Sequence, residues 1–131
     1  MVNNKLKKRG LQYMIELTNR QNEYLEMFLK RIKNNEIYLI YSKFRKFGKT
    51  TIIRELGLYL QSLGYNVAIL TIYNQEYYAH KPIDNINDLR HCTNTVVLVD
   101  TDEFRVHYDI LQNIKEYCNV YTIPMVGFVS I

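Results

Sequence analysis

The sequence has no segment that would place the protein in or across a membrane. No apolar run approaches the roughly 20 residues that a membrane-spanning helix needs. Residues Met1 to Gly10 carry basic side chains, but the apolar region of a secretory signal peptide does not follow them. We therefore expect a cytoplasmic protein without a membrane partner.

Cysteine and histidine are scarce, and their positions form no metal-binding pattern. The chain has two cysteines, Cys92 and Cys118, and three histidines, His80, His91 and His107, without ligand spacing among them. We therefore expect reduced thiols, and no metal or redox centre built from these side chains.

The remaining composition is typical of one globular domain. The 131 residues are 47% hydrophobic and 23% charged, which is ordinary for a domain with a buried core. The net charge of +4 arises mainly from residues 1–10 and 43–49, two segments suited to contact with phosphate. We expect a flexible basic tail at 1–10 and a single domain at 11–131.

The spacing of apolar residues alternates between helical and strand patterns. Three- and four-residue spacing predicts helices, and continuous apolar runs predict strands that are buried on both faces of a sheet. Helices are expected at 11–16, 18–35, 52–63, 86–91 and 103–117, and strands at 37–41, 66–73, 95–99 and 119–123.

Local signals refine these boundaries. Thr18 or Asn19 is suited to cap the second helix, with Glu23 in its next turn, and Lys81–Pro82 is typical of a turn. Pro124 interrupts the apolar C-terminus, so residues 125–131 either continue the last strand past a bulge or form a separate edge segment.

The order of these elements predicts an α/β fold. Strands that alternate with helices form a mostly parallel sheet, because parallel neighbours need a crossover connection. We expect about four to five strands, flanking helices in a three-layer arrangement, and an N-terminal helix.

A phosphate-binding loop is indicated between the strand at 37–41 and the helix that follows it. The loop ends in Gly48-Lys49-Thr50-Thr51, where Gly48 permits close approach of the backbone, Lys49 neutralises phosphate charge and Thr50 holds Mg²⁺. The candidate nucleotide-binding residues are Lys46, Phe47, Gly48, Lys49, Thr50 and Thr51.

A second motif supplies carboxylates about fifty residues after Lys49. Four apolar strand residues end in Asp100, which resembles the Walker B pattern of P-loop NTPases, whose carboxylate holds the water shell of Mg²⁺; Asp102 is an alternative for the same role. The resemblance implies that Glu103, just beyond this carboxylate, is the candidate catalytic base that polarises an attacking water. Asp102 and Glu103 also suit the first turn of a helix, where acids complement the helix dipole.

Together these motifs resemble the Walker A and Walker B elements of P-loop NTPases. Within them, the loop at 44–51 is similar to those of the additional-strand group, which includes the motor cores of phage terminases and helicases. The resemblance covers residues 17–131. It implies a last strand between those at 37–41 and 95–99, with the strand at 66–73 outside them.

The resemblance also implies a function and partners. It suggests an ATP- and Mg²⁺-binding ATPase of phage or mobile-element replication, packaging or DNA processing, completed by self-association or a protein partner, with DNA as a possible ligand. By the same resemblance, Gln21 reads adenine, although it also suits an ordinary helix cap. Thr122 or Ser130 would be the small polar sensor residue at the end of the last strand.

The loop departs from the family pattern at three positions. Lys43 stands where the first glycine is expected, and Phe44 and Phe47 are bulky for a loop that wraps phosphate. One alternative is therefore a catalytically inactive scaffold that binds and inhibits a partner protein. Another is a nucleoside or nucleotide kinase, because thymidine kinases also combine a short Gly-Lys-Thr loop with Asp-Glu after the third strand.

Overall fold

A computed structural model describes residues 18–43, 48–71, 81–83, 85–90, 92–102 and 108–131. The basic tail predicted at 1–10, the helix predicted at 11–16 and the first part of the helix predicted at 103–117 lie outside these residues. In the described part of the chain, no helix is long and apolar enough to span a bilayer.

The core of the molecule is a five-stranded sheet in which all paired strands are parallel. Its order is β1-β5-β4-β2-β3, so the last strand lies between β1 and β4, and β2 lies outside them, which is the order that the resemblance implies. The strands are β1 (Ile37–Ser42), β2 (Asn66–Thr71), β3 (Lys81–Pro82), β4 (Thr95–Asp102) and β5 (Met125–Ser130).

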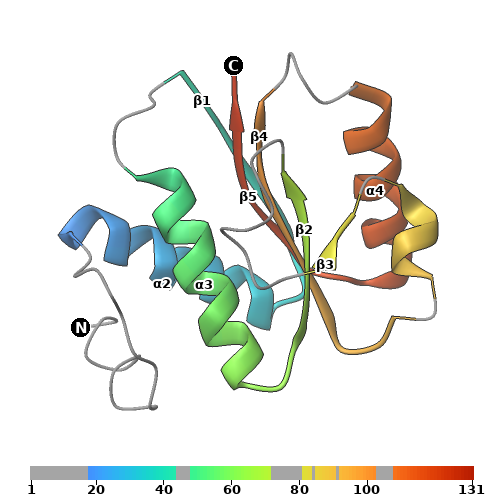
Figure 1. Ribbon diagram of the computed structural model, residues 1–131, viewed down its shortest axis with the longest axis horizontal. Helices are drawn as coiled ribbons and strands as arrows, with labels where there is room; N and C mark the ends of the chain where they lie inside the picture. Colours follow the sequence, from blue (N-terminus) through green and yellow to red (C-terminus); the bar gives the residue numbers. More distant parts are fainter. Residues whose placement is uncertain (1–17, 44–47, 72–80, 84, 91, 103–107) are drawn as a thin grey trace.

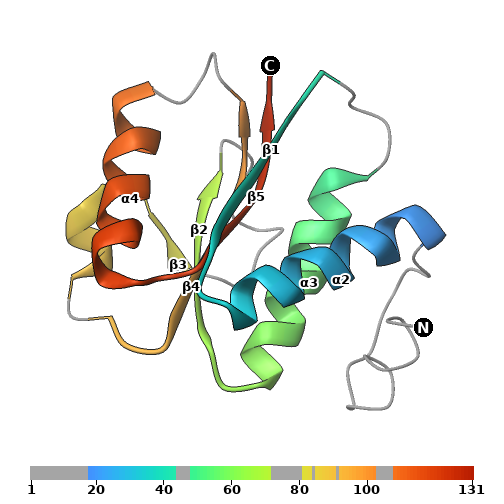
Figure 2. The same ribbon diagram turned by 180° about the vertical axis from the view of Figure 1, so that it is seen from behind.

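Helices cover both faces of this sheet, which confirms the predicted α/β class (Figures 1 and 2). On one face, α2 (Asn19–Lys33) and α3 (Lys49–Ser62) bury Phe28 and Leu56 against Val126 and Phe128. On the other face lie α4 (Tyr108–Tyr121) and the short 3₁₀ helix η2 (Ile86–Leu89), whose apolar side chains join a second core cluster. Burial of these two apolar layers holds the helices onto the sheet.

The start of α2 identifies which predicted cap is used. Thr18 is the N-cap, and its hydroxyl accepts a hydrogen bond from the Gln21 N–H at 3.2 Å. The Gln21 side chain accepts in return from the Thr18 N–H at 2.9 Å, which completes a capping box. Gln21, rather than Glu23, is therefore the residue that closes the first turn.

Two predicted elements are wrong, both around proline. Residues 119–123 are not a strand, because α4 continues to Tyr121 and Met125 begins β5, which lies at the centre of the sheet rather than at its edge. Burial of Leu111, Ile114 and Cys118 anchors α4, and the exposed residues 119–121 extend its last turn. Lys81–Pro82 is not a turn but the edge strand β3, a position where proline is tolerated because its missing N–H costs no ladder hydrogen bond.

Gly127 lets β5 pass between β1 and β4. Its φ is +153°, and a Cβ added there would overlap the carbonyl oxygen of Val99 on the neighbouring strand. Gly64, after α3, also has a positive φ of +94°, but a Cβ there would meet no heavy atom within 4 Å. Backbone conformation is thus constrained at both glycines, and side-chain space only at Gly127.

We predict that Gly127→Ala destabilises the fold much more than Gly64→Ala. The Gly64 variant should lose about 1 kcal/mol of unfolding free energy from its positive φ. The Gly127 variant should lose at least about 3 kcal/mol, because strain and steric overlap add, or it should fail to fold. Urea denaturation of both variants measures the difference. Equal losses would contradict the close approach of β5 to β4.

Candidate functional site

The candidate site lies where three neighbouring strands, β1, β5 and β4, end. In the register of the sheet, Ser130 of β5 is aligned with Ser42 of β1 and with Asp102 of β4. We call this side of the sheet the carboxyl edge. The helix α3 begins at Lys49, close to this edge, so its N-terminus and the strand ends share one region (Figure 1).

The N-terminus of α3 has features that favour negative charge. Gly48 is the N-cap in the left-handed conformation, with φ 73° and ψ 44°, and within the described residues no side chain caps this turn. The first turn holds no acidic residue. Backbone N–H groups and the helix dipole together favour negative charge at such an end, so the sequence prediction of a phosphate site is compatible with this geometry.

Thr50 and Asp100 are in direct contact. The Thr50 hydroxyl donates a hydrogen bond to Asp100 Oδ2 at 2.9 Å, across 50 positions of sequence. Asp100 is 3% exposed, and Asp100 rather than Asp102 is the carboxylate that meets the hydroxyl. A hydroxyl and a carboxylate are ligands that Mg²⁺ prefers, so this pair fits the metal predicted from the sequence.

Lys49 is buried beside the end of β5. The residue is only 7% exposed, and its Nζ donates a hydrogen bond to the Ser130 hydroxyl at 3.3 Å. The same ammonium lies 5.9 Å from the centre of the Phe128 ring. Phe128 and Ser130 are two residues apart on β5 and therefore point to the same face. Of the two sensor candidates, Ser130 lies here and Thr122 lies at the opposite edge of the sheet.

Gln21 lies against the start of α3. It is 9% exposed, and its carboxamide nitrogen occupies the space that a Cβ on Gly48 would enter. The Gln21 carboxamide oxygen is already used in the capping box of α2. Both interpretations of this residue, as a helix cap and as a neighbour of the phosphate loop, are therefore compatible with the geometry.

The other candidates are only partly placed. Thr51 is half-buried in the first turn of α3, next to Gly48. Lys46, Phe47 and the candidate base Glu103 lie outside the described residues, as does Phe44, so the expected wrapping of phosphate by this loop stays a prediction. Among the described residues no group of three or more His, Cys, Asp or Glu side chains is gathered as a metal site.

Glu55 is a buried acid that the sequence pattern did not single out. It is 2% exposed on α3, and among the described contacts its Oε1 lies 3.9 Å from Arg54 Nη2, while Oε2 has no hydrogen-bond partner. Burial raises the pKa of this carboxyl, and the Arg54 charge opposes that shift only in part. Its position between Ile52 and Tyr59 on the apolar face of the helix is the sequence feature that could have predicted its burial.

Comparisons with protein-family models, with curated proteins and with solved structures found no match.

We predict that Glu55→Gln stabilises the protein at pH 7. In the folded protein the pKa of Glu55 is raised above 4.5, so the native state binds more protons than the unfolded state between pH 4.5 and that raised pKa. The free energy of unfolding therefore falls as the pH rises through this interval. The gain from Gln should therefore disappear below about pH 4.5. Denaturant melts across pH test this, with the exposed Glu26→Gln as control. A gain that is equal at low and neutral pH would contradict the prediction.

Proposed function

We propose that the protein binds ATP with Mg²⁺ at the carboxyl edge of its sheet. The observation that carries the proposal is the Thr50–Asp100 hydrogen bond of 2.9 Å. It joins the first turn of a helix, which favours phosphate, to a buried carboxylate near the end of β4, which favours a cation.

The two oxygen ligands match the way proteins hold Mg²⁺. This ion keeps several waters and is bound through one or two protein oxygens together with phosphate groups. Thr50 and Asp100 would supply those oxygens when Mg²⁺ enters between them. The order of the strands and the position of α3 support placement of the chain among P-loop NTPases of the additional-strand group.

Lys49 supplies positive charge to the same region. Its ammonium contacts Ser130 and the Phe128 ring, so phosphate binding would draw it toward the β- and γ-phosphates from a site in which it is already desolvated. Ser130 would then be left near the terminal phosphate, where a hydroxyl can orient a water molecule. Glu103, which follows β4, is the candidate base for that water in ATP hydrolysis.

A second candidate is a scaffold of the same fold that has lost nucleotide binding and acts on a partner protein. One observation favours it, since Lys43 is exposed directly after β1, where the family pattern has glycine. The two candidates differ in a single measurable property, which is whether Mg²⁺-ATP stabilises the folded chain.

We expect Mg²⁺-ATP to raise the thermal unfolding midpoint of the wild type. At 100 times the dissociation constant, ligand binding adds about 2.7 kcal/mol to stability. Lys49→Ala should abolish this shift, whereas Lys33→Ala, an exposed lysine on α2, should preserve it. Differential scanning fluorimetry with and without Mg²⁺ is the measurement. A wild type that Mg²⁺-ATP does not stabilise would support the scaffold instead.

If the bound ATP is hydrolysed, Glu103→Gln should separate binding from chemistry. Loss of a general base lowers turnover by about 100-fold or more, whereas the thermal shift with Mg²⁺-ATP should remain. Phosphate release without an added acceptor measures turnover and also distinguishes an ATPase from a kinase. Unchanged turnover in this variant would remove Glu103 from the mechanism.

A further inference from the structure

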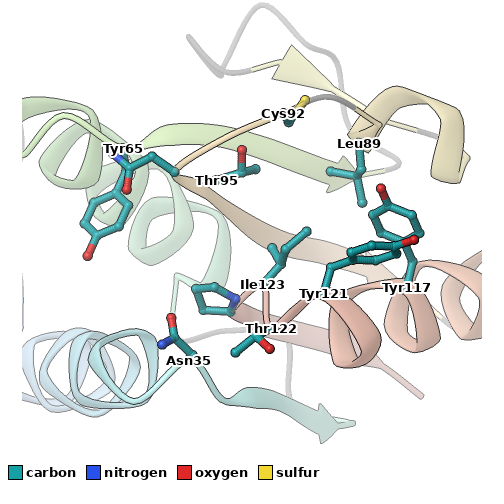
Figure 3. A pocket seen from close by; sticks show the side chains of 11 residues that line it. Asn35, Tyr65, Leu89, Cys92, Thr95, Tyr117, Tyr121, Thr122 and Ile123 are labelled. Carbon is teal, nitrogen blue, oxygen red and sulfur yellow. The ribbon is translucent and has the colours of Figure 1, made fainter.

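A hollow of about 410 Å³ lies at the opposite side of the sheet from Thr50 and Asp100, where the strands begin (Figure 3). We call this side the amino edge. The hollow is formed by the turn before β1, the start of β2, the segment that leads into β4, and the end of α4 with the turn after it. Tyr65 stands on one side, and Tyr117 and Tyr121 stand on the other, with Ile123 between them.

Two further hollows adjoin this one. A hollow of about 520 Å³ shares Tyr65, Cys92 and Thr95 with it, and another of about 360 Å³ shares Asn35 and Thr122. Neighbouring hollows therefore have wall residues in common and lie side by side across the start of the sheet. We call these three hollows together the amino-edge groove.

The described walls of the groove carry little charge. None of the described residues that line the 410 and 520 Å³ hollows is acidic or basic, although 23% of the chain is charged. At the far end, the lining residues Arg31 and Glu36 pair with each other at 3.0 Å. Such a surface is unsuited to phosphate, nucleic acid or metal ions, all of which require compensating charge.

Exposed apolar side chains gather at the same edge. Val120 is 71% exposed and Tyr121 62% exposed at the end of α4, and Leu63, at the end of α3, is 43% exposed. The rings of Tyr117 and Tyr121 lie 4.5 Å apart and present an aromatic wall to the groove. Tyrosine is enriched in protein interfaces because it combines a large apolar ring with a hydrogen-bonding hydroxyl.

We propose that the amino-edge groove docks an uncharged, extended segment of a partner protein. An aromatic or aliphatic side chain of that segment inserts between Tyr65 and the Tyr117–Tyr121 pair. The exposed Asn35 carboxamide suits the peptide groups of such a segment, and so does that of Asn94, whose Nδ2 also donates to the Gly64 carbonyl oxygen at 2.8 Å. A second copy of the chain is a poorer occupant, because each copy carries a net charge of +4 and like charges oppose association. The groove and the nucleotide site lie at opposite edges, so this inference is independent of the proposed function.

The two cysteines provide a local reporter for the groove. Cys92 is half-buried and lines both of its uncharged hollows. Cys118 is fully buried, and burial raises its pKa to about 12, which keeps the thiol protonated and unreactive. Modification by a thiol reagent in the folded protein therefore reports on Cys92.

A displayed library of random peptides, selected on the full-length protein, tests the proposal. Enriched peptides should be uncharged and carry an aromatic or large aliphatic residue, and saturating peptide should slow the modification of Cys92. Tyr121→Lys should weaken their binding by at least about tenfold, because it removes a central aromatic side chain and adds charge. This variant should fold, since Tyr121 is exposed in the last turn of α4, where a cation is favourable.

Tyr41→Lys is the matched control, because Tyr41 is also exposed, at 44%, but lies at the end of β1 on the carboxyl edge. It should leave peptide affinity unchanged. The proposal is overturned if no peptide is enriched, if Tyr121→Lys and Tyr41→Lys have equal effects, or if bound peptide leaves the Cys92 rate unchanged. A wild-type dimer that Tyr121→Lys converts to a monomer would also overturn it, in favour of a second copy as the occupant.

Discussion

All paired strands of the sheet are parallel, so all of them end at one edge and begin at the other. Every connection must return through a helix or a long segment, and the helices that follow the strands begin near the carboxyl edge. This constraint brings Thr50 and Asp100, 50 positions apart in sequence, to hydrogen-bond distance. It also gathers the turns that precede the strands at the amino edge. There Asn35, Asn94 and Thr122 adopt positive φ angles of 50–56° beside the groove.

The candidate site depends on β5 as much as on the loop. This strand occupies the position between β1 and β4, and Gly127 removes the side chain that would prevent its close approach to Val99. Three residues later, Ser130 reaches the carboxyl edge and accepts the hydrogen bond from Lys49. Packing at the centre of the sheet thus determines the position of the Lys49 side chain, although neither Gly127 nor Val99 contacts Lys49 in any described interaction.

Much of this arrangement could be predicted from the sequence, because several signals agreed. The apolar runs before Gly48 and Asp100 identified parallel strands. The sequence Gly48-Lys49-Thr50 at the end of the loop predicted which helix would begin near Asp100. The prediction failed where two tendencies competed. Val120 and Tyr121 have strand-like side chains but extend the last turn of α4, which the buried Ile114 and Cys118 anchor. Pro124 marked the start of a central strand rather than an interruption. The burial of Glu55 and the hollow beside Tyr65 depend on contacts between distant elements, so periodicity alone could not predict them.

The central claim is that Thr50 and Asp100 hold one Mg²⁺ ion together. A double-mutant cycle with Thr50→Val, Asp100→Asn and the double variant, read by calorimetric titration of ATP with and without Mg²⁺, tests it most directly. Each single variant should lose about tenfold or more in Mg²⁺-ATP affinity. Because residues that serve one ion are coupled, the double variant should lose no more affinity than the single variant that binds Mg²⁺-ATP more weakly. All four proteins should bind ATP equally when Mg²⁺ is absent. Additive losses, or equal losses without Mg²⁺, would contradict the account.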